Sequence, residues 1–170
     1  MSVLDVIKTR RSIRKYQSKP VEEEKLLQVL EAGRLAPAAN NAQEWKFIAV
    51  RDPELIKKLV PACGGQSFVG EAPVVLVICA DGEEKIMYCG QPARAIDCSI
   101  ALSFMILEAA ELGLGTCWLG YFSNDKVKRV LNIPADKNVV AVTPLGYANE
   151  SPAPRPRKSV DEVVAYDGWK

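Results

Sequence analysis

Runs of β-branched and apolar residues mark the stretches of this chain that we expect to be strands. Residues 45–50 (WKFIAV) and 138–148 (NVVAVTPLGYA) are rich in such residues. Residues 73–80 (PVVLVICA) are apolar without alternation, which is the pattern of a strand buried on both faces. A shorter strand is predicted at 116–120 (TCWLG), after the glycines of GLG have ended the preceding helix.

Helical patterns fill most of the sequence between these strands. Ser2 and Asp5 form a capping-box pattern, which predicts a first helix that ends near Arg10. After Pro20, acidic residues in the first turn and a leucine-rich face predict a second helix. We expect its apolar face to consist of Leu26, Leu27, Leu30 and Leu35.

Three further helices are predicted in the remainder of the chain, at 53–60, 92–112 and 123–131. The longest is apolar on nearly every side between Ile96 and Leu112, so we expect it to be buried, either centrally or at a subunit interface. No repeat or linker divides the sequence. The chain is therefore expected to form one domain over residues 1–170, with strands separated by helices.

Charge and composition narrow the classes of function. The chain has 170 residues, with 22 Lys and Arg against 21 Asp and Glu. This balance argues against a nucleic-acid or membrane-surface partner, and no apolar run approaches the roughly 20 residues of a membrane span. The acid-containing N-terminus does not resemble a signal peptide, so we expect a cytoplasmic protein. The unpatterned cysteines fit that reducing compartment: Cys63, Cys79, Cys89, Cys98 and Cys117.

The sequence contains no histidine. This excludes Ser-His-Asp and Cys-His catalysis and zinc sites that contain histidine. We therefore predict neither a catalytic side chain nor a metal site. An enzyme of this composition would leave its chemistry to a cofactor.

Positive charge is concentrated near both ends of the chain. The segment KTRRSIRKY (8–16) holds five cations and no acid, and PRPRK (154–158) holds three more. Each cluster alone could be a solvated face, and Arg10 and Arg11 could instead stabilise the end of a helix. Together they favour a small phosphate ligand, because guanidinium groups match phosphate oxygens and Ser12 can donate a hydrogen bond.

Two loops offer other ligand contacts. GLGTCWLG (113–120) could let the backbone approach a flat ligand, although a helix stop with tight packing explains its glycines equally well. PAANNAQEW (37–45) carries amides that suit the edge of a heteroaromatic ring, although asparagine is also common in turns. No G-x-G-x-x-G or P-loop motif occurs.

Four motifs in order, RRSIRKY, APAANNAQEWKF, GLGTCWLG and LGY with RPRK, resemble the nitroreductase-like FMN flavoproteins over essentially the whole chain. The resemblance implies an α+β fold with a mixed, largely antiparallel sheet flanked by helices. It also implies an intertwined homodimer with noncovalent FMN at the subunit interface. Residues 151–170 would form an arm that crosses to the partner subunit.

The resemblance also assigns cofactor contacts. Those to the FMN phosphate and ribityl end would come from Arg10, Arg11, Ser12, Arg14, Arg155 and Arg157. Contacts over the partner's flavin would come from Pro37, Ala38 and Ala39, and the ring or substrate cleft would be lined by Asn41 and Gln43. The strand against the ring would contribute Trp118, Leu119 and Gly120, with a weaker match at Gln66.

The chain departs from the family pattern at three positions. Relatives often have serine where this chain has Ala38 and Ala39, so hydroxyl contacts to the flavin are lost there. They often have proline where this chain has Glu44. We expect Glu44 to face solvent.

The resemblance implies an NAD(P)H oxidoreductase that transfers two electrons by a ping-pong mechanism to a small organic acceptor, such as a nitroaromatic compound or a quinone. Three alternatives stay open. They are a flavin-binding regulatory or storage module without turnover, a related flavin enzyme of the dehalogenase or flavin-degrading type, and a small interaction domain without a cofactor.

Overall fold

The computed structural model describes residues 2–169 and has an α+β architecture. Its sheet has four strands in the order β1-β2-β4-β3, and each neighbouring pair is antiparallel. A single parallel bridge joins Ser12 to Thr116 beside this sheet. The strands are β1 (Trp45–Val50), β2 (Val74–Ala80), β3 (Gly115–Thr116) and β4 (Asn138–Gly146).

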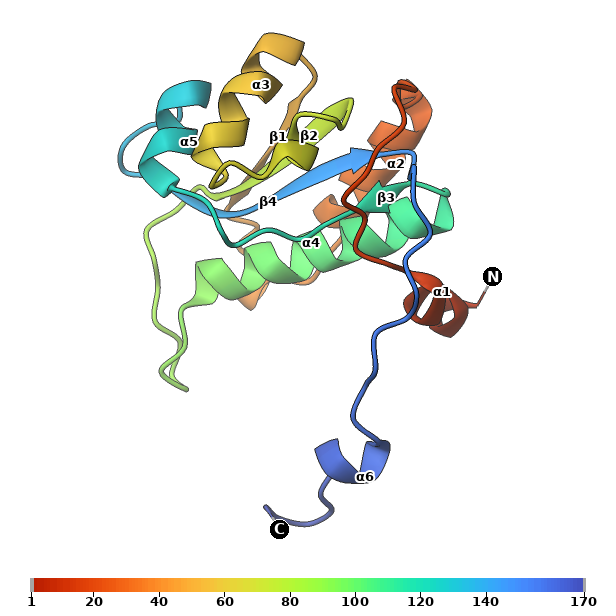
Figure 1. Cartoon of the computed structure of the whole chain (residues 1–170). Coiled ribbons are helices and arrows are strands. Elements are labelled where there is room, and N and C mark those ends of the chain that lie inside the picture. Colours follow the sequence, from red (N-terminus) through yellow and green to blue (C-terminus); the bar gives the residue numbers. More distant parts are fainter. Residues whose placement is uncertain (1, 170) are drawn as a thin grey trace.

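Helices cover both faces of the sheet (Figure 1). On one side α4 runs the length of the sheet with α2 packed against it, and α3 and α5 lie on the other side. The α-helices are α1 (Val3–Thr9), α2 (Glu23–Arg34), α3 (Pro53–Ala62), α4 (Ala93–Glu111), α5 (Asn124–Leu131) and α6 (Val160–Val163). Two short 3₁₀ turns are η1 (Ala39–Asn41) and η2 (Ser67–Val69).

Strand β2 forms the centre of the core, as its continuous apolar sequence predicted. Every residue of β2 is buried, because successive side chains point to opposite faces and both faces are covered. Val75 and Val77 pack with α3 and α5, whereas Leu76 and Ile78 pack with α2 and α4. The strand therefore links two hydrophobic layers.

The buried face of α2 differs from the prediction, and α4 is only partly buried in the single chain. In α2 the buried stripe runs through Leu26, Val29 and Gly33, with Leu30 half-buried, while Leu27 and Leu35 are exposed. This follows helical spacing, since positions 26, 29, 30 and 33 share one face. In α4, Ser103 and Phe104 are exposed, so the helix is not buried on every side in the single chain.

The predicted strand at 116–120 is shorter than expected. Gly115 and Thr116 form a continuous ladder with β4, and Leu119 makes one isolated bridge to Val142 of the same strand. Between them, the N–H of Cys117 donates to the side-chain oxygen of Thr143 at 3.2 Å. A side-chain acceptor thus replaces the backbone ladder at this point.

The segment after α1 lies beside β3 and the segment after β4 at one edge of the sheet. Ile13 donates its N–H to the carbonyl of Thr116 at 2.9 Å, and Tyr16 bridges to Ala148. After residue 151 the chain leaves the body and runs outward to α6 (Figure 1). No helix within residues 2–169 has the length and apolar character of a membrane span.

Candidate functional site

A hollow of about 360 Å³ lies where the N-terminal and C-terminal segments meet. Its lining combines the two cationic clusters of the sequence, although they are far apart along the chain. The residues around it are Ile7, Lys8, Arg10, Arg11, Ser12, Arg14, Pro152, Ala153, Pro154, Arg155 and Arg157.

Local structure explains how the N-terminal half of this hollow forms. Helix α1 is started by the Ser2–Asp5 capping box and ends at Thr9, with Arg10 as its C-cap. The following residues are extended and run beside β3, where Ser12 pairs with Thr116. The cations on either side of Ser12 are thereby presented at the edge of the sheet.

The C-terminal half is aligned on the first by hydrogen bonds between the two segments. Asn149 donates its N–H to the carbonyl of Lys15 at 2.9 Å. The N–H of Arg14 donates to the carboxylate of Glu150. From this anchor the chain continues through the proline-rich segment that carries Arg155 and Arg157.

Arg11 has a structural role at the end of α1. One terminal nitrogen, Nη1, donates to the carbonyls of Lys8, Thr9 and Arg10 at 2.8 to 2.9 Å. These contacts satisfy carbonyl groups that a helix C-terminus leaves without partners. Helix capping, the alternative weighed for Arg11, is thus present, and only the rest of its guanidinium faces the hollow.

The chemistry of the hollow fits a phosphate group. Its ionisable lining consists of cations, with no carboxylate among its lining residues: Lys8, Arg10, Arg11, Arg14, Arg155 and Arg157. Glu150 lines an adjoining hollow of about 260 Å³ that shares Arg10 and Arg11. A dianionic phosphate would balance this excess of positive charge by charge-assisted hydrogen bonds.

The segment predicted to lie against a flavin ring continues from β3, next to the phosphate-sized hollow. Leu119 is buried, while Trp118 is 46% exposed and Gly120 is exposed on either side of it. Burial raises the pKa of the Cys117 thiol, and the nearby cations Arg14 and Arg10 oppose that rise. The thiol therefore lies within electrostatic reach of the cationic cluster but is inaccessible.

Gln66 supports the neighbouring loop. Its amide nitrogen donates to the carbonyl of Cys63 at 2.8 Å and to that of Tyr121 at 3.1 Å. Both amide hydrogens are thereby used within the protein. The sequence suggested a contact with the ring edge, and only the amide oxygen is left for one.

Residues 37–43 lie apart from the phosphate-sized hollow in the single chain. Ala39, Asn40 and Ala42 instead line a hollow of about 530 Å³ together with residues 85–88 and the start of α4. Pro37, Asn41 and Gln43 are exposed, and Ala38 is half-buried. One chain therefore unites the predicted phosphate contacts and does not bring this loop to them.

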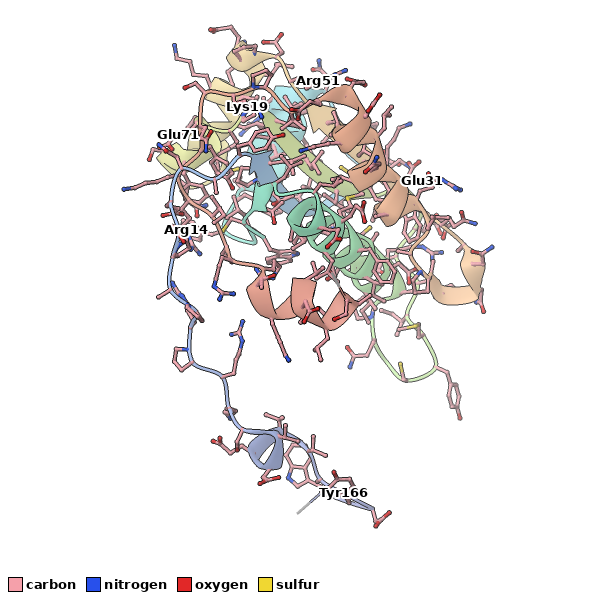
Figure 2. The ribbon with its side chains drawn as sticks, turned by 90° about the vertical axis from the view of Figure 1, so that its right-hand side faces the viewer. Arg14, Lys19, Glu31, Arg51, Glu71 and Tyr166 are labelled. Carbon is pink, nitrogen blue, oxygen red and sulfur yellow. The ribbon has the colours of Figure 1, made fainter. Side chains whose placement is uncertain are left out.

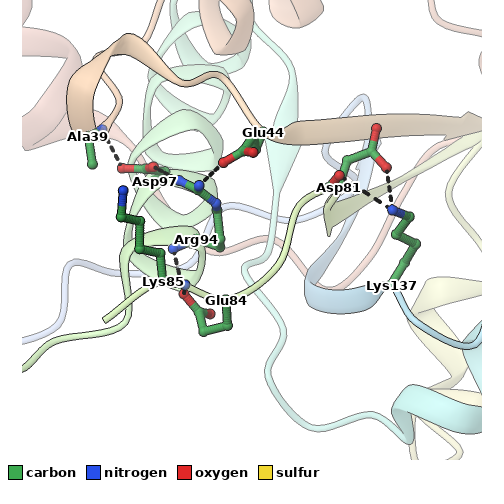
Figure 3. A network of polar contacts seen from close by, with 8 residues as sticks. All are labelled: Ala39, Glu44, Asp81, Glu84, Lys85, Arg94, Asp97 and Lys137. Carbon is green, nitrogen blue, oxygen red and sulfur yellow. Dashed lines mark hydrogen bonds and ion pairs between the residues drawn. The ribbon is translucent and has the colours of Figure 1, made fainter. Parts of the chain in front are cut away.

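The expectation that Glu44 faces solvent holds only in part, because 39% of its side chain is exposed but its carboxylate is paired within the protein. Its carboxylate forms an ion pair with Arg94 at the start of α4, and Arg94 also lies 3.8 Å from Asp97 (Figure 3). Asp97 in turn accepts a hydrogen bond from the N–H of Ala39 at 2.9 Å. Arg94 and Asp97 were not among the predicted site residues, although two opposite charges three residues apart in an apolar helix are visible in the sequence.

The residues match the family model described as Nitroreductase family over 7–69 and 62–147, which together span most of the chain. The chain belongs to the nitroreductase family. Within residues 2–169, no three or more Cys, Asp or Glu side chains are grouped as metal ligands.

Individual members of the nitroreductase family are similar along most of their length. A protein of Methanothermobacter thermautotrophicus named NADH dehydrogenase/NAD(P)H nitroreductase is 38% identical, over 96% of this chain and 86% of its own. An FMN reductase [NAD(P)H] of Bacillus subtilis is 30% identical, over 95% and 72%. The crystal structure of a nitroreductase family protein from Clostridium novyi superposes with a TM-score of 0.84 at 34% identity, over 95% and 91%.

Proposed function

We propose that this chain is an FMN-dependent NAD(P)H oxidoreductase that passes two electrons to a small organic acceptor, such as a nitroaromatic compound or a quinone. One observation carries the proposal: the two cationic clusters of the sequence line a single hollow that contains no carboxylate. FMN ends in a phosphate, and relatives named for FMN reduction and NAD(P)H use share this fold.

The chain's own residues hold the phosphate from both ends. Arg10, Ser12 and Arg14 donate from the segment after α1, and Arg155 and Arg157 donate from the tail. Guanidinium groups remain charged at any physiological pH, so the clamp binds phosphate without a titrating partner. Arg11 contributes the N–H groups of its guanidinium that are not used to cap α1.

When bound, FMN supplies the two-electron redox chemistry, and the protein supplies orientation and exclusion of water. The exposed residues Trp118 and Gly120 would provide a surface for the ring, and buried Leu119 fixes that surface to β4. Donor and acceptor use one cleft in turn, which is a ping-pong mechanism. No side chain is assigned a covalent role, in keeping with a sequence that has no histidine.

The working unit is a homodimer with one FMN site at each end of the interface. In this arrangement Pro37, Ala38 and Ala39, with Asn41 and Gln43, cover the flavin held by the partner, which accounts for their distance from the phosphate hollow. Residues 151–170 cross to the partner subunit. Five free cysteines fit a reducing compartment such as the cytoplasm.

The test is the absorption spectrum of the purified full chain before and after addition of NADH or NADPH under anaerobic conditions. We expect a flavin spectrum that is bleached by at least one donor and restored by a quinone. A colourless protein that gains no thermal stability with FMN would overturn the proposal. Bound flavin that neither donor bleaches would favour a binding module without turnover.

A further inference from the structure

The N-terminal part of α4 holds two charged side chains that are almost completely buried. Arg94 has 8% of its side chain exposed and Asp97 has 5%. Burying charges in an apolar helix is costly unless they are paired and hydrogen-bonded. The contacts of Arg94 and Asp97 therefore indicate their structural role.

Both charges reach the segment that contains residues 37–44. The carboxylate of Glu44 pairs with the Arg94 guanidinium at the end of this segment. Asp97 accepts the N–H of Ala39 near its start, at 2.9 Å. Figure 3 shows both contacts reaching the N-terminal part of α4, one at Arg94 and one at Asp97.

The start of α4 also forms hydrogen bonds with the segment that precedes this helix. Arg94 donates its backbone N–H to the carboxylate of Glu84 at 2.9 Å, and Ala93 donates to the carbonyl of Lys85 at 2.8 Å. The hollow of about 530 Å³ lies between these two segments, with Arg94 in its lining. The N-terminal part of α4 thus contacts both of the segments that line this hollow.

The segment 37–44 needs such a restraint. Asn40, Asn41 and Gln43 have φ angles of 54°, 54° and 52°. These values lie in the left-handed region, which residues other than glycine rarely adopt. Backbone of this kind persists where surrounding contacts hold it in place. The contacts that Glu44 and Ala39 make with α4 bracket these three residues.

We propose that Arg94 and Asp97 are positioning residues that fix the segment 37–44 in the conformation that covers bound FMN. The inference rests on the proposed function, in which this segment lies over the partner's flavin. Neither residue is a phosphate contact, since both lie outside the hollow formed by the chain ends. The pair with Glu44 is particular to chains that carry an acid at that position.

The primary test is Glu44→Gln, because Glu44 is the more exposed partner and the variant is expected to fold. Dilution of the holoenzyme with detection of released flavin fluorescence gives the FMN dissociation constant. We expect this constant to rise about fivefold to tenfold, within the usual range for coupled contacts. The circular dichroism of the bound flavin should change, and KM for a quinone should rise more than kcat falls.

Asp97 supplies a second test by rescue. Asp97→Asn keeps an oxygen that accepts the Ala39 N–H, whereas Asp97→Ala removes it. We expect the alanine variant to weaken FMN binding and alter the flavin dichroism more than the asparagine variant does. Equal effects of the two would mean that the hydrogen bond to Ala39 does not position the segment.

Lys137→Met is the matched control. Lys137 belongs to a neighbouring ion-pair group with Asp81 at 3.3 Å and Asp136 at 3.2 Å (Figure 3). The backbone N–H of Asp81 donates to the carbonyl of Glu44 at 3.1 Å, so this variant disturbs an ion pair close to Glu44 while leaving its carboxylate and Arg94 in place. Its FMN affinity should stay within about twofold of wild type, as expected for a partly exposed pair.

The inference is overturned if Glu44→Gln keeps the wild-type dissociation constant and flavin dichroism, or if Lys137→Met changes them as much. In either case a wild-type protein that binds FMN and is bleached by NAD(P)H would leave the proposed function intact. A wild-type protein that does not bind FMN would contradict both the inference and the proposed function.

Discussion

The backbone N–H of Arg14 donates a hydrogen bond to the carboxylate of Glu150, which lies 136 residues later in the chain. Next to it, Gln17 donates its N–H to the carbonyl of Tyr147 at 2.9 Å. These contacts hold residues 14–17 beside residues 147–150. The alignment turns two separate basic segments into one phosphate-sized hollow.

Glu150 affects this hollow in two ways, by accepting the hydrogen bond from Arg14 and by placing a negative charge nearby. Two substitutions of Glu150 separate these effects. Glu150→Ala removes the acceptor for Arg14 and should weaken FMN binding by about threefold to tenfold, since hydrogen bonds to charged groups are worth roughly 1.5–3 kcal/mol and part of this will be regained from water. Glu150→Gln keeps an acceptor and removes a negative charge near the phosphate, so its affinity should match or exceed that of wild type. Titration of FMN into both variants checks this, and equal weakening would contradict it.

Arg10→Ala removes one charge-assisted contact with the phosphate. We expect a loss of about 1.5–3 kcal/mol, which corresponds to roughly 10- to 100-fold in FMN affinity. Arg51→Ala is the control, because Arg51 is a half-exposed arginine paired with Glu23 and lies far from Arg14 (Figure 2). Its FMN affinity should not change. A normal affinity for Arg10→Ala would exclude Arg10 from the clamp.

The end of the tail carries apolar side chains that the single chain leaves in solvent. Val160, Val163, Tyr166 and Trp169 are all exposed, and Tyr166 lies far from the body of the molecule (Figure 2). A chain that stops after Ser159 keeps Arg155 and Arg157 but loses these groups. We expect its dimer to dissociate at a concentration at least about 100-fold higher, because buried aromatic anchors dominate interfaces.

Sedimentation velocity over a concentration series measures this shift. The full-length chain with FMN bound should remain a dimer at micromolar concentration. Dimerisation of the truncated chain at the same strength would show that the tail does not contribute to the interface.

Buried thiols should make the fold sensitive to alkaline pH. Burial raises the pKa of Cys63 and Cys79 to about 11 and that of Cys98 to about 12. An unfolded thiol ionises near pH 8.5, so above that pH the unfolded state loses protons that the folded state keeps. The free energy of unfolding should therefore be unaffected by these groups below about pH 8 and fall above it, by up to about 1.4 kcal/mol per pH unit for each thiol.

Urea unfolding at pH values from 7 to 10.5, at fixed protein and FMN concentrations, measures this slope. Cys98→Ala should be less stable at neutral pH, because it leaves a cavity, yet its stability should fall less steeply above pH 9. An identical slope for the variant and the wild type would show that Cys98 does not titrate as expected.

The sequence predicted the strands best where one physical rule governed them. The continuous apolar run of β2 was correctly assigned to a strand covered on both faces, and the helix with Pro53 at its start was also found. The strand at 116–120 was overestimated, because the hydroxyl of Thr143 takes the N–H of Cys117 out of the ladder. A side-chain oxygen that accepts a hydrogen bond in place of a backbone carbonyl cannot be recognised from local composition.

The candidate site shows the same division. The phosphate-sized hollow was predictable, because two acid-free basic clusters are visible in the sequence itself. The Glu44–Arg94 pair was not, since it joins residues 50 positions apart through a loop whose path depends on tertiary contacts. In the proposed function, residues 37–43 lie over a flavin held by a second subunit, and the sequence pattern of one chain cannot define such an arrangement.

The comparison of FMN with riboflavin tests the phosphate clamp most directly, because the two ligands differ only in the phosphate. The dissociation constants of both would be measured for the wild type and for the double variant Arg10→Ala/Arg155→Ala. We predict that the wild type binds FMN at least about 100-fold more tightly than riboflavin, equivalent to about 2.7 kcal/mol. In the double variant this preference should fall to within about tenfold, with little change in riboflavin affinity. Equal affinity of the wild type for the two ligands, or an undiminished preference in the double variant, would contradict the account.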